Sequence, residues 1–308
     1  MYFCGFIPIK FGCSKEMDFK NSRYHAIAFS IVVIWGTTFI STKFLLLNGL
    51  SPESIFLYRF VLAYIGIRFF GKSRLFANNR KDEFIFLLIG ITGGSLYFLA
   101  ENFALKITQA TNVAFIVCAA PLLTAGLSHI YLKNEKTDRR LIQGSVLALL
   151  GVALVVFNGK FILQLNPLGD LLSLLAALSW AFYTILLKQV SHRYSMVFIT
   201  RKVFFYGILT ILPAFIFHPL TTDTSLLFRP IVYLNLLFLG IAASLLCYFF
   251  WNIAIKHLGA IQTTNYVYIV PIITLIASSL FLDETITVFA VTGMLMILAG
   301  VVWVERGK

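Results

Sequence analysis

Ten apolar segments, each close to the length that a helix needs to cross a lipid bilayer, constrain the fold of this chain most strongly. A spanning helix takes about 20 mostly apolar residues, with a range of roughly 17–25. The segments that qualify or nearly qualify are 26–47, 54–70, 84–105, 110–132, 141–157, 168–190, 196–217, 231–254, 260–282 and 285–304. The connections between them are too short to fold as a soluble domain. The sequence therefore predicts an all-α integral membrane protein with ten transmembrane helices.

The composition agrees with this class. Charged residues make up 12% of the 308 residues and hydrophobic ones 59%, whereas soluble domains have about 25% and about 45–50%. A net charge of +12 could indicate a nucleic-acid partner, but the basic residues lie at the ends of the apolar segments. We therefore expect the lipid bilayer as a partner and no nucleic acid.

The basic residues also predict the orientation. Twenty Lys and Arg residues fall at the membrane face that holds the N-terminus, and three fall at the other, namely Lys106, Lys160 and Arg229. Short cytoplasmic loops carry this excess, so both termini should be cytoplasmic, in a bacterial inner membrane. Residues 1–23 should form a cytoplasmic tail because they lack the cleavage pattern of a signal peptide. Within that tail, either Met1 or Met17 can be the translation start.

The chain repeats itself. Residues 104–124 align with 254–274 at an offset of 150, which pairs the prolines at 121 and 271. Trp35 and Lys43 recur with the same spacing of eight as Trp180 and Lys188. We place the first five-helix repeat at 24–159 and the second at 160–308. Five is an odd number, so the second repeat should be inverted in the membrane. Inverted repeats are typical of secondary transporters that work by alternating access, although duplication also occurs in membrane proteins that transport nothing.

The order of motifs in both repeats adds a resemblance. The first reads WGTTF, AENFALK, NVAFI and APLLT, and the second reads GDLLSLLAALSWAFYTILLK, YIVPIIT and DET. This pattern resembles the EamA family of the drug/metabolite transporter superfamily. The resemblance implies a ten-helix, exporter-like permease whose fourth and ninth spans line a central cavity, with the fifth and tenth at the periphery.

The resemblance also implies a small-molecule solute, such as an amino acid or related metabolite, exported by a secondary transporter that protons can drive. One alternative is the efflux of lipophilic drugs, which a cavity lined with aromatic residues and lacking paired charges would favour. A second alternative is a non-transporting membrane subunit or a membrane enzyme.

Three charged residues lie inside the first three spans: Lys43, Arg59 and Glu101. Each costs about 2.5–3.5 kcal/mol near a helix centre and is a functional candidate by default. All three should share one depth near the outer face, where Lys43 or Arg59 can pair with Glu101. Lys43 can instead extend its amine to the headgroups. Glu101 is the best proton carrier if transport is proton-coupled, or else part of a fixed ion pair.

Further candidates lie in or near the same spans. Pro121 and Pro271 are expected in the middle of helices, where proline frees a carbonyl and kinks the helix. The remaining candidates for the solute site are Trp35, Asn112, Trp180, Tyr183, Gln262, Asn265 and Tyr266. Any of the polar side chains among them can instead tie neighbouring helices together.

Glycines spaced by seven, Gly144 with Gly151 and Gly293 with Gly300, predict small faces on the fifth and tenth spans. Such faces allow close helix approach. This approach can occur within one chain or in a dimer, so monomer and homodimer both stay open.

Enzyme readings have little support. The sequence has no HExxH, no Walker-type glycine loop and no GxSxG, and its four cysteines lack metal-ligand spacing. We expect no catalytic residue, no metal and no cofactor.

Overall fold

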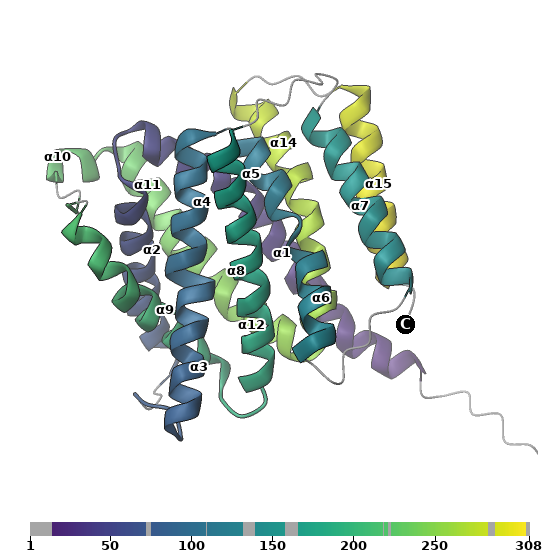
Figure 1. Ribbon diagram of the computed structural model, residues 1–308, viewed down its shortest axis with the longest axis horizontal. Helices are drawn as coiled ribbons and strands as arrows, with labels where there is room; N and C mark the ends of the chain where they lie inside the picture. Colours follow the sequence, from purple (N-terminus) through teal and green to yellow (C-terminus); the bar gives the residue numbers. More distant parts are fainter. Residues whose placement is uncertain are drawn as a thin grey trace, which may run out of the picture.

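The computed structural model describes residues 14–71, 75–108, 110–131, 139–157, 166–217, 219–220, 223–282 and 287–305, and within these ranges every regular element is a helix. The first half contains α1 (Ser14–Leu47), α2 (Pro52–Ile67), α3 (Arg80–Gly90), α4 (Leu96–Ile107), α5 (Ala110–Val117), α6 (Ala120–Tyr131) and α7 (Arg139–Phe157). The second half contains α8 (Pro167–Val190), α9 (Met196–Ile211), α10 (Thr224–Leu227), α11 (Pro230–Leu237), α12 (Cys247–Leu258), α13 (Ala260–Asn265), α14 (Val270–Leu282) and α15 (Val288–Glu305). The helices form one bundle (Figure 1).

Seven helices in the described ranges are long and apolar enough to cross a membrane: Ser22–Leu47, Arg80–Ile107, Val113–Tyr131, Pro167–Val190, Met196–Ile216, Pro230–Leu258 and Ala260–Ala277. They correspond to seven of the ten predicted segments. The other three predicted segments fall on α2, α7 and α15. The all-helical membrane class predicted from the sequence is thereby confirmed.

Two of the long helices contain a π-helical turn. The turn η2 (Ile91–Ser95) joins α3 to α4, and the turn η4 (Phe238–Leu246) joins α11 to α12. The two turns lie at equivalent positions, since the offset of 150 residues that aligns the repeats places the residues of η2 within η4. The backbone of η2 departs from helical geometry at Gly94, with φ −130° and ψ −105°. Such turns are rare and occur frequently at functional sites.

Pro121 and Pro271 lie inside the long helices Val113–Tyr131 and Ala260–Ala277, each just after a local departure from α-helical geometry. Helix α5 ends at Val117, a turn follows at Cys118–Ala119, and Pro121 is the second residue of α6. In the second half, a 3₁₀ segment η5 (Tyr266–Ile269) precedes α14, where Pro271 is again the second residue. Proline is well suited to the first turn of a helix because its missing N–H has no intrahelical partner there. Each proline therefore follows a local break inside a longer helix.

Helices α7 and α15 pack closely along one edge of the bundle (Figure 1). A Cβ added at Gly144 would lie 2.6 Å from the carbonyl oxygen of Gly300, and one at Gly151 would lie 2.6 Å from that of Gly293. Only residues without a side chain allow backbones this close. The predicted small faces therefore meet each other within one chain.

A polar junction forms where α3 begins, α8 ends and α9 begins. Asp82 accepts a hydrogen bond from the Tyr194 hydroxyl at 2.6 Å and forms an ion pair with Arg193 at 2.6 Å. Beside it, Glu83 accepts from Lys202 and from the Tyr206 hydroxyl. Four of these side chains come from the second half of the chain and bind the two acids of the first half, so the junction ties the two halves together.

An apolar junction occupies the equivalent position at the other end of the bundle, where α11 begins, α1 ends and α2 begins. Its buried apolar members are Leu45, Leu50, Ile55, Leu226, Val232, Leu236, Leu239 and Ala243, and Glu53 and Ser54 are also buried where α2 begins.

Candidate solute cavity

A small cavity lies between the two halves of the bundle. Solute pockets typically combine apolar walls with a few polar groups. The lining residues are Trp35, Thr38, Phe39, Arg59, Tyr97, Phe98, Glu101, Ala114, Val117, Cys118, Trp180, Tyr248, Val267 and Val270. The cavity is thus built from α1, α2, α4, α5, α8, α12, α14 and the η5 segment.

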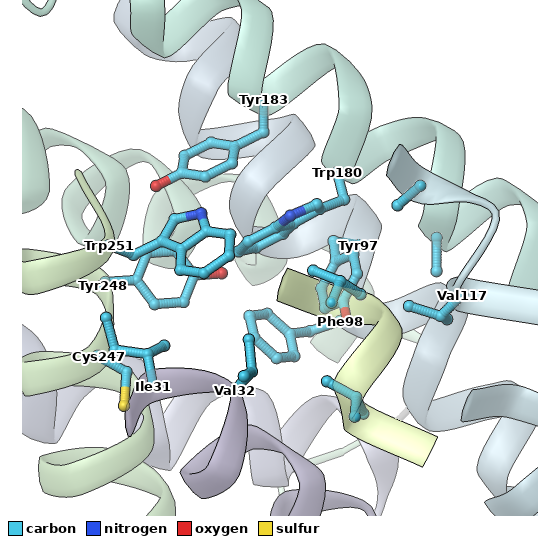
Figure 2. Packing of buried hydrophobic residues seen from close by; sticks show 14 of the residues in the cluster. Ile31, Val32, Tyr97, Phe98, Val117, Trp180, Tyr183, Cys247, Tyr248 and Trp251 are labelled. Carbon is cyan, nitrogen blue, oxygen red and sulfur yellow. The ribbon is translucent and has the colours of Figure 1, made fainter. Parts of the chain in front are cut away.

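Aromatic rings form most of the wall. Trp35 packs edge-on against Trp180, with ring centroids 5.2 Å apart, and lies 4.7 Å from Trp251. Tyr97 lies 5.1 Å from Trp180. Figure 2 shows Trp180, Tyr248 and Trp251 close together, with Phe98 and Tyr97 beside them. Such rings offer a large apolar surface for a solute together with a few N–H and O–H donors.

Two opposite charges face the cavity from the first half. Arg59 is 2% exposed, donates from Nε to Ser244 Oγ at 2.9 Å, and holds its guanidinium carbon 4.2 Å from the centre of the Phe98 ring. Glu101 is 6% exposed and accepts a hydrogen bond from the Tyr97 hydroxyl at 2.9 Å. These two described residues do not form a direct ion pair. Their opposite charges still attract each other at longer range. Both side chains are therefore held by hydrogen bonds to neutral neighbours.

Lys43 lies away from this pair. Its amine donates to the carbonyl oxygens of Leu105 and Thr108, at 2.6 and 3.3 Å, so the expected pairing with Glu101 does not form. Lys188 does the same for the equivalent helix, donating to Ile255 at 3.2 Å and Lys256 at 3.4 Å. Cations are stabilising at helix C-termini because the last carbonyls lack intrahelical partners. Each lysine is therefore a cap on a neighbouring helix, α4 or α12.

Several other predicted residues lie outside the lining set. The Tyr183 hydroxyl donates to Asn252 Oδ1 at 2.6 Å, and Tyr266 shares a 2.7 Å hydrogen bond with His25. Asn265 is 1% exposed, and neither atom of its amide group has a partner in the described part of the chain.

Of the remaining candidates, Gln262 is half-buried and the side chain of Asn112 lies outside the described residues. Pro121 and Pro271 do not line the cavity. The helix breaks that precede the prolines do line the cavity: Val117 and Cys118 from the first break, and Val267 from the second. The two breaks are in contact. The Cys118 thiol donates a hydrogen bond to the Val267 carbonyl oxygen, with 3.6 Å between Sγ and the oxygen.

Sequence reasoning missed several lining residues, of which Tyr97, Phe98 and Tyr248 are the largest. A signal for each of them was present. Tyr97 precedes Glu101 by four residues and so lies on the same helix face. Phe98 and Tyr248 are equivalent at the offset of 150 that aligns the repeats.

The described residues hold no group of three or more His, Cys, Asp or Glu side chains that could bind a metal ion. Within these ranges the polar chemistry of the cavity rests on Arg59, Glu101 and the hydroxyl and indole donors around them.

Comparison with known proteins defines the class of this chain. The model of the EamA-like transporter family matches residues 23–157 and again 167–306. The chain therefore belongs to the EamA-like transporter family, in which it carries two repeats of the family unit. It is a multi-pass membrane protein of a family of transporters.

Individual relatives agree with this class. An "Uncharacterized transporter" of Archaeoglobus fulgidus is 28% identical over 91% of this chain and 96% of its own length. A "Probable amino-acid metabolite efflux pump" of Salmonella typhimurium is 24% identical over 89% and 92%. A protein of known crystal structure superposes with a TM-score of 0.74, covering 92% of this chain and 97% of its own. Its sequence identity is 15%, so that likeness concerns the fold alone.

Proposed function

We propose that this protein is a secondary transporter that exports a small organic metabolite, such as an amino acid, by alternating access. The observation that carries the proposal is the cavity between the two halves, where Arg59 and Glu101 are buried among aromatic rings. A charged pair inside a membrane bundle is costly and marks a path for a polar solute. The name of the Salmonella relative, an amino-acid metabolite efflux pump, supports the same solute class.

The proposal includes a topology. Counting α2, α7 and α15 with the seven longer helices gives ten spans, five in each half, and an odd number inverts the second half. The excess of Lys and Arg on one face supports cytoplasmic termini. The polar junction then lies at the cytoplasmic end and the apolar junction at the outer end. The paired lysine caps support an inverted repeat, since they hold equivalent helices from opposite ends of the bundle.

The cavity chemistry favours a polar metabolite over a lipophilic drug. Aromatic walls suit both solutes, but a lipophilic solute would leave the charged atoms of Arg59 and Glu101 without partners, which is costly. A zwitterion offers a carboxylate to the guanidinium and an ammonium to the carboxylate.

Counterflow in proteoliposomes tests the proposal. The purified protein is reconstituted into vesicles preloaded with one unlabelled metabolite, and uptake of the same labelled compound is measured across a panel of amino acids, related metabolites and lipophilic cations. We expect uptake for at least one zwitterionic compound, and less uptake for the Arg59→Gln variant. A panel in which only lipophilic cations move, or nothing moves, would contradict the proposal.

Glu101 is the proposed proton carrier. The variant Glu101→Gln keeps the shape of the side chain but cannot lose a proton, so we expect counterflow to persist while uptake driven by a pH gradient is lost. Asp223→Asn, which changes an exposed acid before α10, is the matched control and should keep both activities. Gradient-driven uptake by Glu101→Gln would show that another group couples transport to protons.

A further inference from the structure

The two π-helical turns are held by side chains of the cavity wall. Tyr248 donates from its hydroxyl to the carbonyl oxygen of Gly93 in η2, at 2.6 Å. Trp35 donates from its indole Nε1 to the carbonyl oxygen of Ala243 in η4, at 3.1 Å. Both rings line the cavity. The cavity wall that a solute would contact thus includes the two rings that hold the turns.

The two hydrogen bonds are equivalent and crossed. Gly93 and Ala243 are 150 residues apart, the offset that aligns the two repeats. Tyr248 belongs to the second half and holds the turn of the first, while Trp35 belongs to the first half and holds the turn of the second. Tyr248 and Trp35 are not equivalent residues in the two repeats. What the two repeats share is a hydrogen bond from a cavity side chain to the carbonyl of the π-helical turn.

The turns are suited to change. A π-helical turn holds an extra residue relative to an α-helix and is found mostly as a local insertion at functional sites. The turn η2 is packed through small residues, with Gly94 close to Gly207 of α9. When such a turn shifts, the part of the helix beyond it rotates, and in α4 that part carries Glu101.

We infer that Trp35 and Tyr248 are positioning residues that couple occupation of the cavity to the π-helical turns of the opposite half. A solute that displaces either ring weakens one hydrogen bond and releases one turn, which lets that long helix change its shape during alternation. This inference rests on the proposed transport function, but the hold on the turns can be measured without any solute.

Hydrogen–deuterium exchange of the detergent-purified full chain provides that measurement. Trp35→Phe and Tyr248→Phe each remove one donor and keep an aromatic ring. We expect Trp35→Phe to speed exchange in peptides from 238–246 and not in those from 91–95, and Tyr248→Phe to do the reverse. Loss of one hydrogen bond corresponds to about three- to tenfold faster local exchange. Each turn keeps at least one further side-chain hydrogen bond in either variant, from Ser179 to the Thr92 carbonyl in η2 and from Arg59 to Ser244 in η4.

Trp180→Phe is the matched control for exchange. Trp180 lines the same cavity and is the repeat equivalent of Trp35, but its Nε1 has no hydrogen-bond partner in the described part of the chain. The variant removes the same atoms without removing a bond, so both turns should exchange as in the unmodified protein. Faster exchange in 238–246 for both tryptophan variants, or in neither, would overturn the inference.

Counterflow then separates coupling from binding. With a solute identified by the panel above, Trp35→Phe should lower the maximal rate about three- to tenfold and leave the half-saturating concentration near that of the unmodified protein. A change in half-saturation alone would mean that Trp35 contacts the solute without controlling the turn. If no solute in the panel moves, the proposed function fails, and the crossed exchange pattern still decides whether the two rings hold the turns.

Discussion

The two ends of the bundle are built on the same plan and closed by different chemistry. At one end, Asp82 of α3 meets Tyr194, which follows α8. At the other end, Val232 of α11 and Leu50, which follows α1, occupy the equivalent positions in the apolar junction. Duplication preserved the backbone arrangement, because helices α3 and α11 still pack against α9 and α2. It did not preserve the side chains, since either a satisfied polar cluster or an apolar one can fill such a site.

The difference has a physical consequence. Buried charges stabilise only while every partner is present, whereas apolar side chains lose stability in proportion to the volume removed. Variants at the polar junction should therefore respond to the loss of a single partner and to pH. Variants at the apolar junction should respond to side-chain size.

Glu83→Gln should have the largest effect. Lys202 is 2% exposed, and removing the carboxylate leaves its amine buried without an opposite charge, which should cost about 2–3 kcal/mol of unfolding free energy. Reversible unfolding in mixed detergent micelles measures the loss. The double variant Glu83→Met with Lys202→Met removes both charges and should regain part of it. A double variant as unstable as the sum of both single changes would contradict an ion-pair role.

Leu50→Ala should cost about 2 kcal/mol in the same assay, since truncation of a buried leucine leaves a cavity. Leu50 is 3% exposed and belongs to the apolar junction. Leu50→Met conserves the volume and is the control, with an expected loss below about 1.5 kcal/mol. A loss that varies with pH between 6 and 9 would be inconsistent with an apolar junction.

Tyr194→Phe should cost about 1 kcal/mol, because it removes the hydroxyl that Asp82 and the Asn78 N–H bind. Burial, and next the hydrogen bond to Asp82, raise the pKa of Tyr194. The neutral hydroxyl is therefore the form that stabilises the fold, and its contribution is complete below about pH 10, the ordinary tyrosine pKa. The stability difference from the unmodified protein should stay constant from pH 6 to 9 and shrink only at higher pH. A difference that disappears near pH 8 would rule out this hydrogen bond as its source.

Lys43→Met and Lys188→Met should have the smallest effects, about 0.5–1 kcal/mol each, the contribution of a cation at a helix C-terminus. Lys43 caps α4 at the apolar end and Lys188 caps α12 at the polar end. The two losses of stability should be similar, because a lysine caps a helix C-terminus in the same way at both ends of the bundle. A much larger loss for Lys43 would indicate that it acts beyond its cap.

The family and the membrane class could be predicted from the sequence because they depend on local or repeated properties. Hydropathy over about 20 residues identifies a span without reference to its neighbours. The offset of 150 identifies equivalent residues, as the helix breaks before Pro121 and Pro271 illustrate. Both prolines lie inside long helices, but proline alone does not specify the local irregularity, which is a turn before Pro121 and a 3₁₀ segment before Pro271.

The site could be predicted only in part. Trp35, Arg59, Glu101 and Trp180 were candidates and line the cavity, whereas Tyr97 and Tyr248 were missed. Spacing along a helix gives the depth of a side chain in the membrane, and depth placed Lys43, Arg59 and Glu101 together. The direction in which a side chain points depends on how its helix is rotated against the others, which no local pattern specifies.

The sequence by itself determined that this chain is a duplicated helical membrane protein, because apolar length and repetition are properties of the chain alone. Only the tertiary structure decided what its charges do. Lys43 caps a helix, Arg59 and Glu101 face the cavity, and Asp82 and Glu83 close one end of the bundle. A buried charge is defined by its partners, and most of these partners lie tens to more than a hundred residues away along the chain.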